Sequence, residues 1–316
     1  MHCCIDRLHH QHHHQSLSHR QLQLLHTERV ESIPMCMRHQ ILWTLFFFLA
    51  ADAANALASL PKILPDGRHV HIIKNDILTN SIGDFIVNRV EELACEAISR
   101  KGAFSMSVGS GTTVTPLVQL AESSSIDMNK VHVFFGNERT EGDDAGKCAS
   151  FGAQVFSTLG IPEGNLHRVP EMASAEDAAN VYEAKMRAMP HDIIGINDNT
   201  GMPQLDLCLL GSGADGHCAS LYPNSPQVTC SPGSNAAYLP AEGKGGITIT
   251  IDAINSARNV IVSACKASQS DMVRKSLSWS NASTNHALPA GMISTKEGAV
   301  VEWILSHESA ADLPAM

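Results

Sequence analysis

The apolar residues of this chain follow two alternating patterns, and each pattern predicts one kind of element. Short segments in which apolar residues are consecutive or alternate with polar ones predict strands at 70–73, 104–108, 131–135, 166–169, 247–251, 260–264 and 300–305. Apolar positions three and four residues apart predict helices over 82–98, from about 116, around 148–159 and after 174. Gly102 is expected to end the first helix, and Ser174 with Asp177 can cap the last one. Strands alternating with helices are typical of an α/β fold whose mostly parallel sheet is covered by helices on both faces.

One stretch joins a buried strand to polar chemistry. Residues 205–223 have the sequence LDLCLLGSGADGHCASLYP, in which five of the first six residues are apolar and glycines follow. Such a run predicts a strand buried on both faces, and open α/β sheets bind ligands beyond the carboxyl ends of these strands. Glycines allow φ > 0, so the bend can hold Asp215 and His217 at the mouth of a crevice. A helix is expected to start at Ser220 and Leu221. The alternative for His217 is a core histidine bonded to a carbonyl.

A second candidate is the loop GSGTT, which lies between a predicted strand and a predicted helix. It consists of Gly109, Ser110, Gly111, Thr112 and Thr113. Backbone N–H groups and hydroxyls at a helix N-terminus can bind an anion. The loop has neither the lysine of a P-loop nor the third glycine of a dinucleotide fingerprint. A tight turn without a ligand is therefore the alternative.

The third candidate is Asn137-Glu138-Arg139, which follows the strand predicted at 131–135. An arginine at the carboxyl end of a strand can hold phosphate or carboxylate oxygens with two hydrogen bonds. The alternative is a surface salt bridge between Glu138 and a neighbour. The sequence alone leaves both interpretations open.

Composition excludes several classes of function. The 316 residues are 44% apolar and 17% charged, which is typical of a globular protein with one large domain or two small ones. The formal charge is −10, from 22 basic and 32 acidic residues, and no basic patch is evident, so neither nucleic acid nor an anionic membrane is an expected partner. Nine cysteines without CxxC spacing argue against a zinc ribbon and a disulfide scaffold, and favour free thiols.

The first 60 residues are expected to lie outside the folded domain, which is predicted to span 61–316. Residues 1–34 hold eight of the 17 histidines without a core pattern, which indicates a leader rather than a metal-binding tract. The apolar run at 41–50 follows basic residues and precedes small ones, as in a signal peptide, and is too short for a membrane span. A secretory or organellar location is expected, without stable membrane insertion of the mature domain. Asn281 is a glycosylation acceptor in the secretory case. The alternative for the apolar run is a buried helix of the folded domain, and the alternative location is the cytoplasm.

The stretch at 205–223 resembles the GxGxDGHxASLFPG signature of the 6-phosphogluconolactonases. Tyr222 stands in the usual Phe place, and the matching residues are Gly211, Gly213, Asp215, Gly216, His217, Ala219, Ser220, Leu221 and Pro223. The resemblance implies the Rossmann-like architecture of lactonases and sugar-phosphate isomerases. It also implies hydrolysis of 6-phosphogluconolactone to 6-phosphogluconate, in the oxidative pentose phosphate pathway, without a metal or an organic cofactor.

The same resemblance implies roles for individual residues. His217 would be the general base that activates water, which suits the chemistry of an imidazole, and Asp215 would orient it. Backbone N–H groups of the glycine-rich turn, with Gly213 among the substrate-binding residues, would stabilise the charge on the lactone carbonyl oxygen. The GSGTT loop and Arg139 would contact the sugar phosphate, since the family carries SGGST and DER at these places.

Three positions depart from the family pattern. Asn137 replaces an Asp, Gly246 stands where an Arg is usual, and Gln269 stands where a Lys is usual. Lys244 and Lys266 lie nearby and are the candidate replacements for the phosphate-binding cations. The departures leave open a non-catalytic sugar-phosphate-binding paralogue. An amino-sugar-phosphate deaminase/isomerase is a further alternative, although those enzymes carry FNEP where this chain has residues 220–223. A monomer or a small homo-oligomer is expected.

Overall fold

The computed structural model describes residues 61–74, 81–229, 233–241, 245–278 and 286–314. The chain divides into two units, Met1–Ala58 and Ser59–Met316, and every described residue lies in the second. The predicted leader and targeting segment, the Asn281 acceptor and Lys244 lie outside the described residues and stay predictions. None of the described helices is both long enough and apolar enough to cross a membrane.

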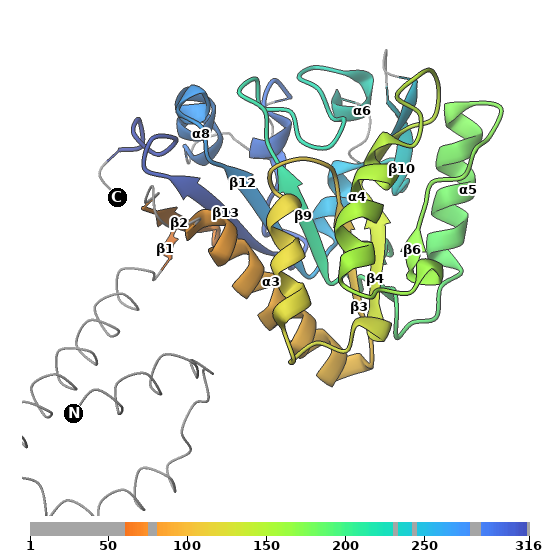
Figure 1. Cartoon of the computed structure of the whole chain (residues 1–316). Helices are drawn as coiled ribbons and strands as arrows, with labels where there is room; N and C mark the ends of the chain where they lie inside the picture. Colours follow the sequence, from red (N-terminus) through yellow and green to blue (C-terminus); the bar gives the residue numbers. More distant parts are fainter. Residues whose placement is uncertain (1–60, 75–80, 230–232, 242–244, 279–285, 315–316) are drawn as a thin grey trace, which may run out of the picture. The chain divides into compact units, whose positions relative to one another are not determined.

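The core of the described unit is an eight-stranded sheet (Figure 1). Its order is β1 (Lys62–Ile63), β2 (His69–Ile73), β13 (Val300–Ser306), β12 (Asn259–Ala264), β9 (Leu207–Gly211), β3 (Phe104–Val108), β4 (Val131–Phe135) and β6 (Leu166–His167). Every neighbouring pair is parallel except β1 with β2. The predicted mostly parallel sheet is therefore confirmed.

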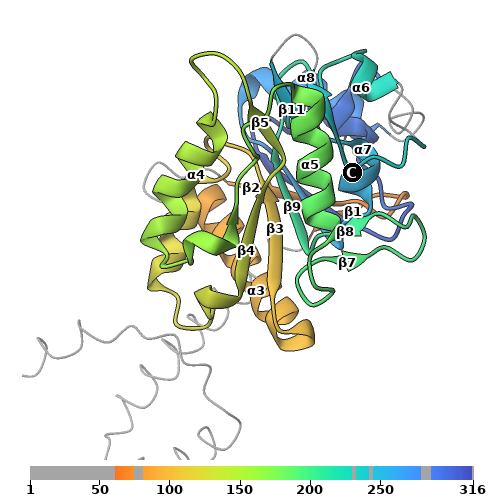
Figure 2. The ribbon, with the colours of Figure 1, turned by 90° about the vertical axis from the view of Figure 1, so that its right-hand side faces the viewer.

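Helices pack on both faces of this sheet, and Figure 2 shows α4 and α5 on opposite sides of it. One core holds residues of α3 (Ser81–Lys101), the 3₁₀ helix η1 (Thr115–Glu122) and α4 (Lys147–Thr158). The other holds residues of α5 (Ala175–Arg187), α7 (Ile251–Asn255) and α8 (Ser270–Leu277). In β9, Leu207 and Leu209 point into the first core and Cys208 and Leu210 into the second, as a strand buried on both faces requires.

The remaining described elements are short. They are the 3₁₀ helices η2 (Met128–Lys130), η3 (Glu163–Asn165), η4 (Ala267–Gln269) and η6 (Pro289–Met292), helix α6 (Pro226–Thr229), and the paired strands β7 (Gly195–Ile196) and β8 (Pro203–Gln204). Both predicted helix ends are confirmed. Gly102 adopts φ 92° after α3, and the Ser174 hydroxyl accepts a hydrogen bond from the Asp177 N–H at 3.1 Å.

Three local predictions are wrong. The strand predicted at 166–169 ends at His167. The strand predicted at 247–251 ends at Ile249, because the Thr250 hydroxyl accepts a hydrogen bond from the Ala253 N–H at 3.2 Å and starts α7. This strand, β11 (Gly246–Ile249), lies in a separate antiparallel sheet between β10 (Tyr238–Ala241) and β5 (Asn137–Arg139). No helix starts at Ser220 and Leu221, because Ala219 has φ 49° and the chain makes a tight turn there.

The sheet has a point at which the direction of winding reverses. Strands β3 and β9 are neighbours, but the chain continues from β3 to β4 and β6 on one side, and from β9 to β12 and β13 on the other. The connections after β3 and β9 therefore leave the sheet in opposite directions. Beyond the carboxyl ends of such a strand pair lies the usual ligand crevice of an open α/β sheet.

A buried charge cluster joins β2, β13 and helix α3. The Glu302 carboxylate contacts His71 Nε2 at 3.0 Å and accepts a hydrogen bond from Arg89 Nε at 2.8 Å. Burial acts to raise the pKa of Glu302, but the bonds from His71 and Arg89 prevail and lower it. A carboxyl whose pKa is lowered on folding contributes stability above its unfolded pKa and loses it as the pH falls through the folded value.

We expect Glu302→Gln to lower the free energy of unfolding by about 3 kcal/mol at neutral pH, because it removes one partner of a buried charge pair. The difference from the parent should shrink as the pH falls below the ordinary glutamate pKa of 4.5 and through the lowered pKa of the folded state, where the carboxylate is protonated. Urea denaturation across this range measures both. The control is Glu92→Gln, which removes an exposed carboxylate bonded to the same Arg89. Equal losses of unfolding free energy in the two variants would contradict a stabilising role for the buried Glu302 carboxylate.

Candidate active site

The three predicted loops meet at the carboxyl edge of β3, β4 and β9. A Cβ atom added to Gly211 would lie 3.0 Å from Thr113 Oγ1, and one added to Gly109 would lie 3.3 Å from Asn137 Oδ1. The Asn137 amide nitrogen in turn donates to Ser220 Oγ at 3.1 Å. The GSGTT loop, the Asn137-Glu138-Arg139 segment and the bend after β9 are therefore brought together, as their positions after parallel strands predict.

His217 and Asp215 form a bonded pair within the bend. His217 Nδ1 lies 2.6 Å from Asp215 Oδ1, which also accepts the His217 backbone N–H at 3.2 Å. Partial burial acts to raise the pKa of Asp215, but the two bonds from His217 prevail and lower it, so the group is a carboxylate at neutral pH. A carboxylate only accepts hydrogen bonds, so Nδ1 is the donor in this contact, and Nε2 is the ring nitrogen that the contact leaves for another partner.

The His217 ring is 36% exposed, so it is not packed in the core. Its other ring contact is Tyr222, at 5.1 Å between centroids. The core-histidine alternative is therefore wrong, and a water molecule can approach the ring. An imidazole bonded to a carboxylate and open to solvent has the contacts that general-base chemistry requires.

The glycines of the bend are required by close contacts. A Cβ on Gly213 would lie 2.2 Å from His217 Nδ1 and 2.5 Å from Asp215 Oδ1. Gly216 has φ 91°, and a Cβ there would lie 2.8 Å from a methyl carbon of Leu288. The Gly213 N–H donates to the His217 carbonyl at 2.8 Å, and the Gly216 N–H donates to the Gly213 carbonyl at 3.0 Å. These two N–H groups are thus used inside the bend.

Glu138 is a buried anchor and not part of a surface salt bridge. Its side chain is 4% exposed and accepts three backbone N–H groups, from Arg139 at 2.9 Å, Cys148 at 2.9 Å and Ala149 at 2.6 Å. The last two belong to the first turn of α4, whose N–H groups have no partner within the helix. Glu138 therefore joins β5 to α4 and fixes the backbone that carries Arg139.

We expect Glu138→Ala to lower the free energy of unfolding by about 2 to 3 kcal/mol, because it leaves buried N–H groups without an acceptor. Urea denaturation measures this loss. Glu163→Ala is the control, since Glu163 is exposed and its ion pair with Arg168 is a surface contact worth less than about 1 kcal/mol. A loss for Glu138→Ala as small as for the control would show that the anchor is dispensable.

The Gly246 position explains one departure from the family pattern. Gly246 lies opposite Arg139 in the small sheet, and a Cβ there would lie 2.1 Å from the Glu138 carbonyl oxygen. No side chain fits at this position while β5 and β11 stay paired. An arginine at Gly246 is therefore incompatible with this backbone.

A cavity of about 500 Å³ opens at the same edge of the sheet. Thr112, Thr113, Ser212, Lys266 and Gln269 are among the residues that line it, together with apolar residues of α3 and η1. The cavity is large enough for a sugar-sized ligand. Of the predicted site residues, His217, Asp215, Arg139, Gly109, Ser110, Gly111 and Gly213 are not among its lining residues.

Gln269 organises this cavity, and sequence reasoning did not assign it a role. Its amide nitrogen donates to the Ser212 carbonyl at 2.6 Å, and its amide oxygen accepts the Lys266 N–H at 2.7 Å. The side chain thereby ties the end of β9 to the turn after β12. In the sequence, only a polar residue soon after a predicted strand could have pointed to this role, and many surface residues share that position.

Comparisons with known proteins agree with this architecture. Residues 79–303 match the family described as glucosamine-6-phosphate isomerases/6-phosphogluconolactonase. The chain belongs to this family. The family resemblance predicted from the central motif is therefore confirmed. The predicted hydrolase class is confirmed by the relatives described next, which are named as lactonases. Among the described residues, no group of three or more His, Cys, Asp or Glu side chains is arranged to hold a metal ion.

Relatives of the family cover most of the chain. A 6-phosphogluconolactonase 3, chloroplastic, of Arabidopsis thaliana is 31% identical over 234 residues, which are 70% of this chain and 69% of that protein. A probable 6-phosphogluconolactonase 3, chloroplastic, of Oryza sativa subsp. indica is 29% identical over 249 residues, 74% of each chain. The structure of 6-phosphogluconolactonase from Trypanosoma cruzi superposes with a TM-score of 0.63 at 21% identity, covering 80% of this chain and 99% of that one. This likeness shows the shared fold.

Proposed function

We propose that this protein hydrolyses 6-phospho-D-glucono-1,5-lactone to 6-phosphogluconate, a step of the oxidative pentose phosphate pathway. The observation that carries the proposal is the exposed His217–Asp215 pair, 2.6 Å apart, at the sheet edge where the sugar-sized cavity opens. The names of the relatives support the same substrate. No cofactor takes part in the proposed reaction.

The proposed mechanism begins with His217. Its Nε2 takes a proton from a water molecule as the water oxygen attacks the lactone carbonyl carbon. Negative charge develops on the carbonyl oxygen. As this charge returns to the carbonyl, the bond from the carbonyl carbon to the ring oxygen breaks, and the ring oxygen takes the proton that His217 Nε2 removed from the water. The carboxylic acid that forms releases its own proton to solvent. Asp215 holds the imidazole ring of His217 in position and stabilises the imidazolium that forms during the attack. The products are a carboxylate and a free hydroxyl.

Gly213 has a steric role in this proposal. Its N–H already donates to the His217 carbonyl at 2.8 Å, so it is not available to the carbonyl oxygen of the lactone. Its missing side chain leaves the space that the imidazole and the carboxylate occupy. We therefore propose that Gly213 shapes the pair rather than binds the substrate.

We place the phosphate of the substrate in the cavity beside the GSGTT loop. Thr112 and Thr113 line the cavity, and Lys266 lines it beyond the end of β12. Gly109, Ser110 and Gly111 set the path of the loop. Arg139 and Lys244 are the other cations that we assign to the substrate, the latter from its position in the sequence.

We expect Lys266→Ala to raise KM for the lactone about tenfold or more, because a charged contact to phosphate contributes about 1.5 to 3 kcal/mol. The value of kcat should change little, since Lys266 binds the substrate away from the reacting carbon. Steady-state kinetics measure both values. Lys147→Ala, which removes an exposed lysine paired with Asp144, is the control. An unchanged KM would remove Lys266 from the phosphate site.

The function is tested by following lactone disappearance in the presence of the purified parent protein. A rate well above spontaneous hydrolysis supports the proposal. No excess rate would favour the non-catalytic paralogue, and release of ammonia from glucosamine 6-phosphate would favour the deaminase/isomerase. Both alternatives contradict the proposal.

For location, we propose that residues 1–60 direct the protein to an organelle. The named relatives from Arabidopsis thaliana and Oryza sativa are chloroplastic, which supports an organelle over the secretory pathway. Fusing residues 1–60 to a fluorescent protein tests this proposal. Diffuse cytoplasmic fluorescence, or a product whose Asn281 site is glycosylated when the full chain is expressed, would overturn it.

A further inference from the structure

A second cavity lies beyond the amino-terminal ends of β9, β12 and β13, at the end of the main sheet opposite the active-site cavity. Its volume is about 290 Å³. Arg100 of α3, Asp206 before β9, Arg258 before β12 and Val300 at the start of β13 are among its lining residues. None of them belongs to the candidate active site, whose cavity lies beyond the other ends of the same strands. The proposed function therefore leaves this cavity without a role.

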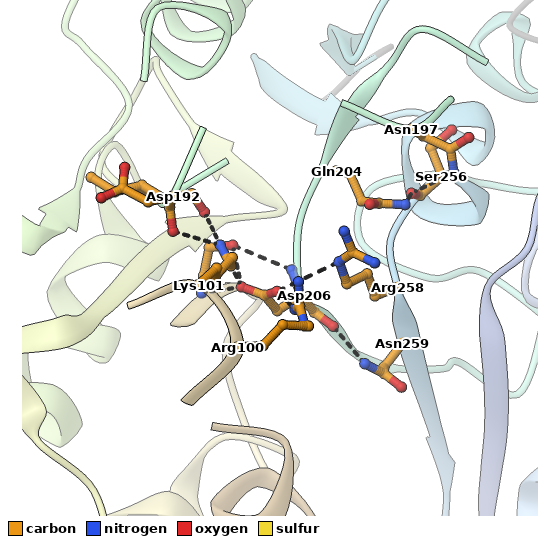
Figure 3. Close-up of polar contacts among 11 residues, drawn as sticks. Arg100, Lys101, Asp192, Asn197, Gln204, Asp206, Ser256, Arg258 and Asn259 are labelled. Atoms are coloured by element: carbon orange, nitrogen blue, oxygen red, sulfur yellow. Dashed lines mark hydrogen bonds and ion pairs between the residues drawn. The ribbon is translucent and has the colours of Figure 1, made fainter. Parts of the chain in front are cut away.

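Asp206 gathers positive charge at this cavity (Figure 3). It is 2% exposed, and its Oδ1 atom lies 2.9 Å from Arg100 Nη2 and 3.9 Å from Arg258 Nε. Its Oδ2 atom lies 2.9 Å from Lys101 Nζ and accepts the Ser105 N–H at 2.9 Å. One buried carboxylate thus faces three cations, which it cannot neutralise alone.

Lys101 is committed to the protein, whereas the two arginines reach the cavity. Lys101 also donates to the carbonyls of Asp192 and Ile193, and it is 13% exposed. Burial lowers the pKa of its ammonium, and the charges of Arg100 and Arg258 lower it further against the opposing effect of Asp206. Arg100 and Arg258 are 37% and 44% exposed and both line the cavity.

We propose that this cavity binds a small anion, a phosphate or carboxylate group, between the guanidinium groups of Arg100 and Arg258. A guanidinium has five N–H donors, so an arginine that bonds Asp206 through one edge keeps donors for a second anion. Asp206 holds both arginines in place before the ligand arrives, which reduces the entropy lost on binding.

The charge of the cavity limits the number of negative charges that its ligand can carry. Glu96 also lines it, so the cluster of Arg100, Lys101, Arg258, Asp206 and Glu96 has only one more positive than negative group. Such a site suits one phosphate or carboxylate group and disfavours a polyanion, because Glu96 repels further negative charge. The exposed Val300 side chain offers an apolar contact to a small organic ligand.

Val300 allows a test that leaves the arginine cluster intact. Val300 lines the cavity beside Arg258, and its side chain is exposed. Its backbone N–H donates to the Arg258 carbonyl at 2.8 Å, so a change of its side chain leaves that bond in place. Val300→Glu places a negative charge at the site, and Val300→Gln is the neutral control of the same shape. Inorganic phosphate and succinate are titrated separately into the ¹⁵N-labelled full chain of the parent and of each variant, and the Asn259 and Gly298 amide signals are followed.

The parent and Val300→Gln are expected to show saturable shifts of these amides, and Val300→Glu should raise Kd about tenfold. Saturation by phosphate alone identifies a phosphate ester as the ligand class, and saturation by succinate alone identifies a carboxylate. The Thr113 amide reports separately on the active-site cavity, so failure of one site does not hide the other. Absence of saturable shifts with both probes, or equal Kd values in the two Val300 variants, would overturn the proposal.

Discussion

Replacing His217 by Ala is expected to lower kcat/KM for the lactone by about 10²- to 10⁴-fold, because it removes the group that takes a proton from the attacking water. The expected loss is mainly in kcat, since His217 is placed at the reacting carbon and not at the phosphate. The fold should be retained, because the ring is one-third exposed and contacts Asp215 and Tyr222, which lie close to it in the sequence. The rate of lactone disappearance, corrected for spontaneous hydrolysis, measures the effect.

The matched control is His191→Ala, which removes an exposed histidine from the segment after α5. This variant should keep the parent rate, and both variants should show the parent's thermal unfolding midpoint. If His217→Ala retained the parent rate, the general base would have to be another residue. If only its KM rose, His217 would bind the substrate and not activate water.

Sequence reasoning predicted the main sheet because its strands carry a local signal. The predicted bounds 104–108 and 131–135 agree with the observed strands, since apolar residues dominate or alternate within five positions there. The cap at Ser174 was equally local, because donor and acceptor lie three residues apart. Position after such strands also predicted which loops meet.

The small sheet of β5, β10 and β11 was not predicted, for a physical reason. Strand β5 has three residues, which are too few to show a period of two, and all three are polar or charged. Its pairing with β11 joins segments far apart in the sequence. For the same reason the charged Glu138 was compatible with a surface salt bridge, whereas the structure buries it against the first turn of α4.

In the candidate site, too, the sequence predicted the local contacts and missed those between distant segments. The pairing of His217 with Asp215 is local, so the motif predicted it, and the structure places the two side chains in contact. The positions of Lys266 and Gln269 in the cavity depend on contact between the turn after β12 and the end of β9. The hydrophobic pattern of the sequence gives no information about this contact. The cluster around Asp206 also joins three separate segments, and its charge excess was invisible in a chain of net charge −10.

Replacing Gly213 by Ala is expected to lower kcat about 100-fold, the effect of displacing a catalytic group by about 1 Å. The new Cβ would lie 2.2 Å from His217 Nδ1, 2.3 Å from its Cε1 and 2.5 Å from Asp215 Oδ1. All three atoms belong to partly exposed side chains that can rotate away, so the clash should break the pair while the free energy of unfolding stays close to that of the parent. Kinetics and urea denaturation separate the two effects, and Gly164→Ala, whose Cβ meets no atom within 4 Å, is the control. Parent kcat in Gly213→Ala would mean that the His217–Asp215 contact is unnecessary for the reaction, whereas a large loss of stability would mean that Gly213 serves the fold.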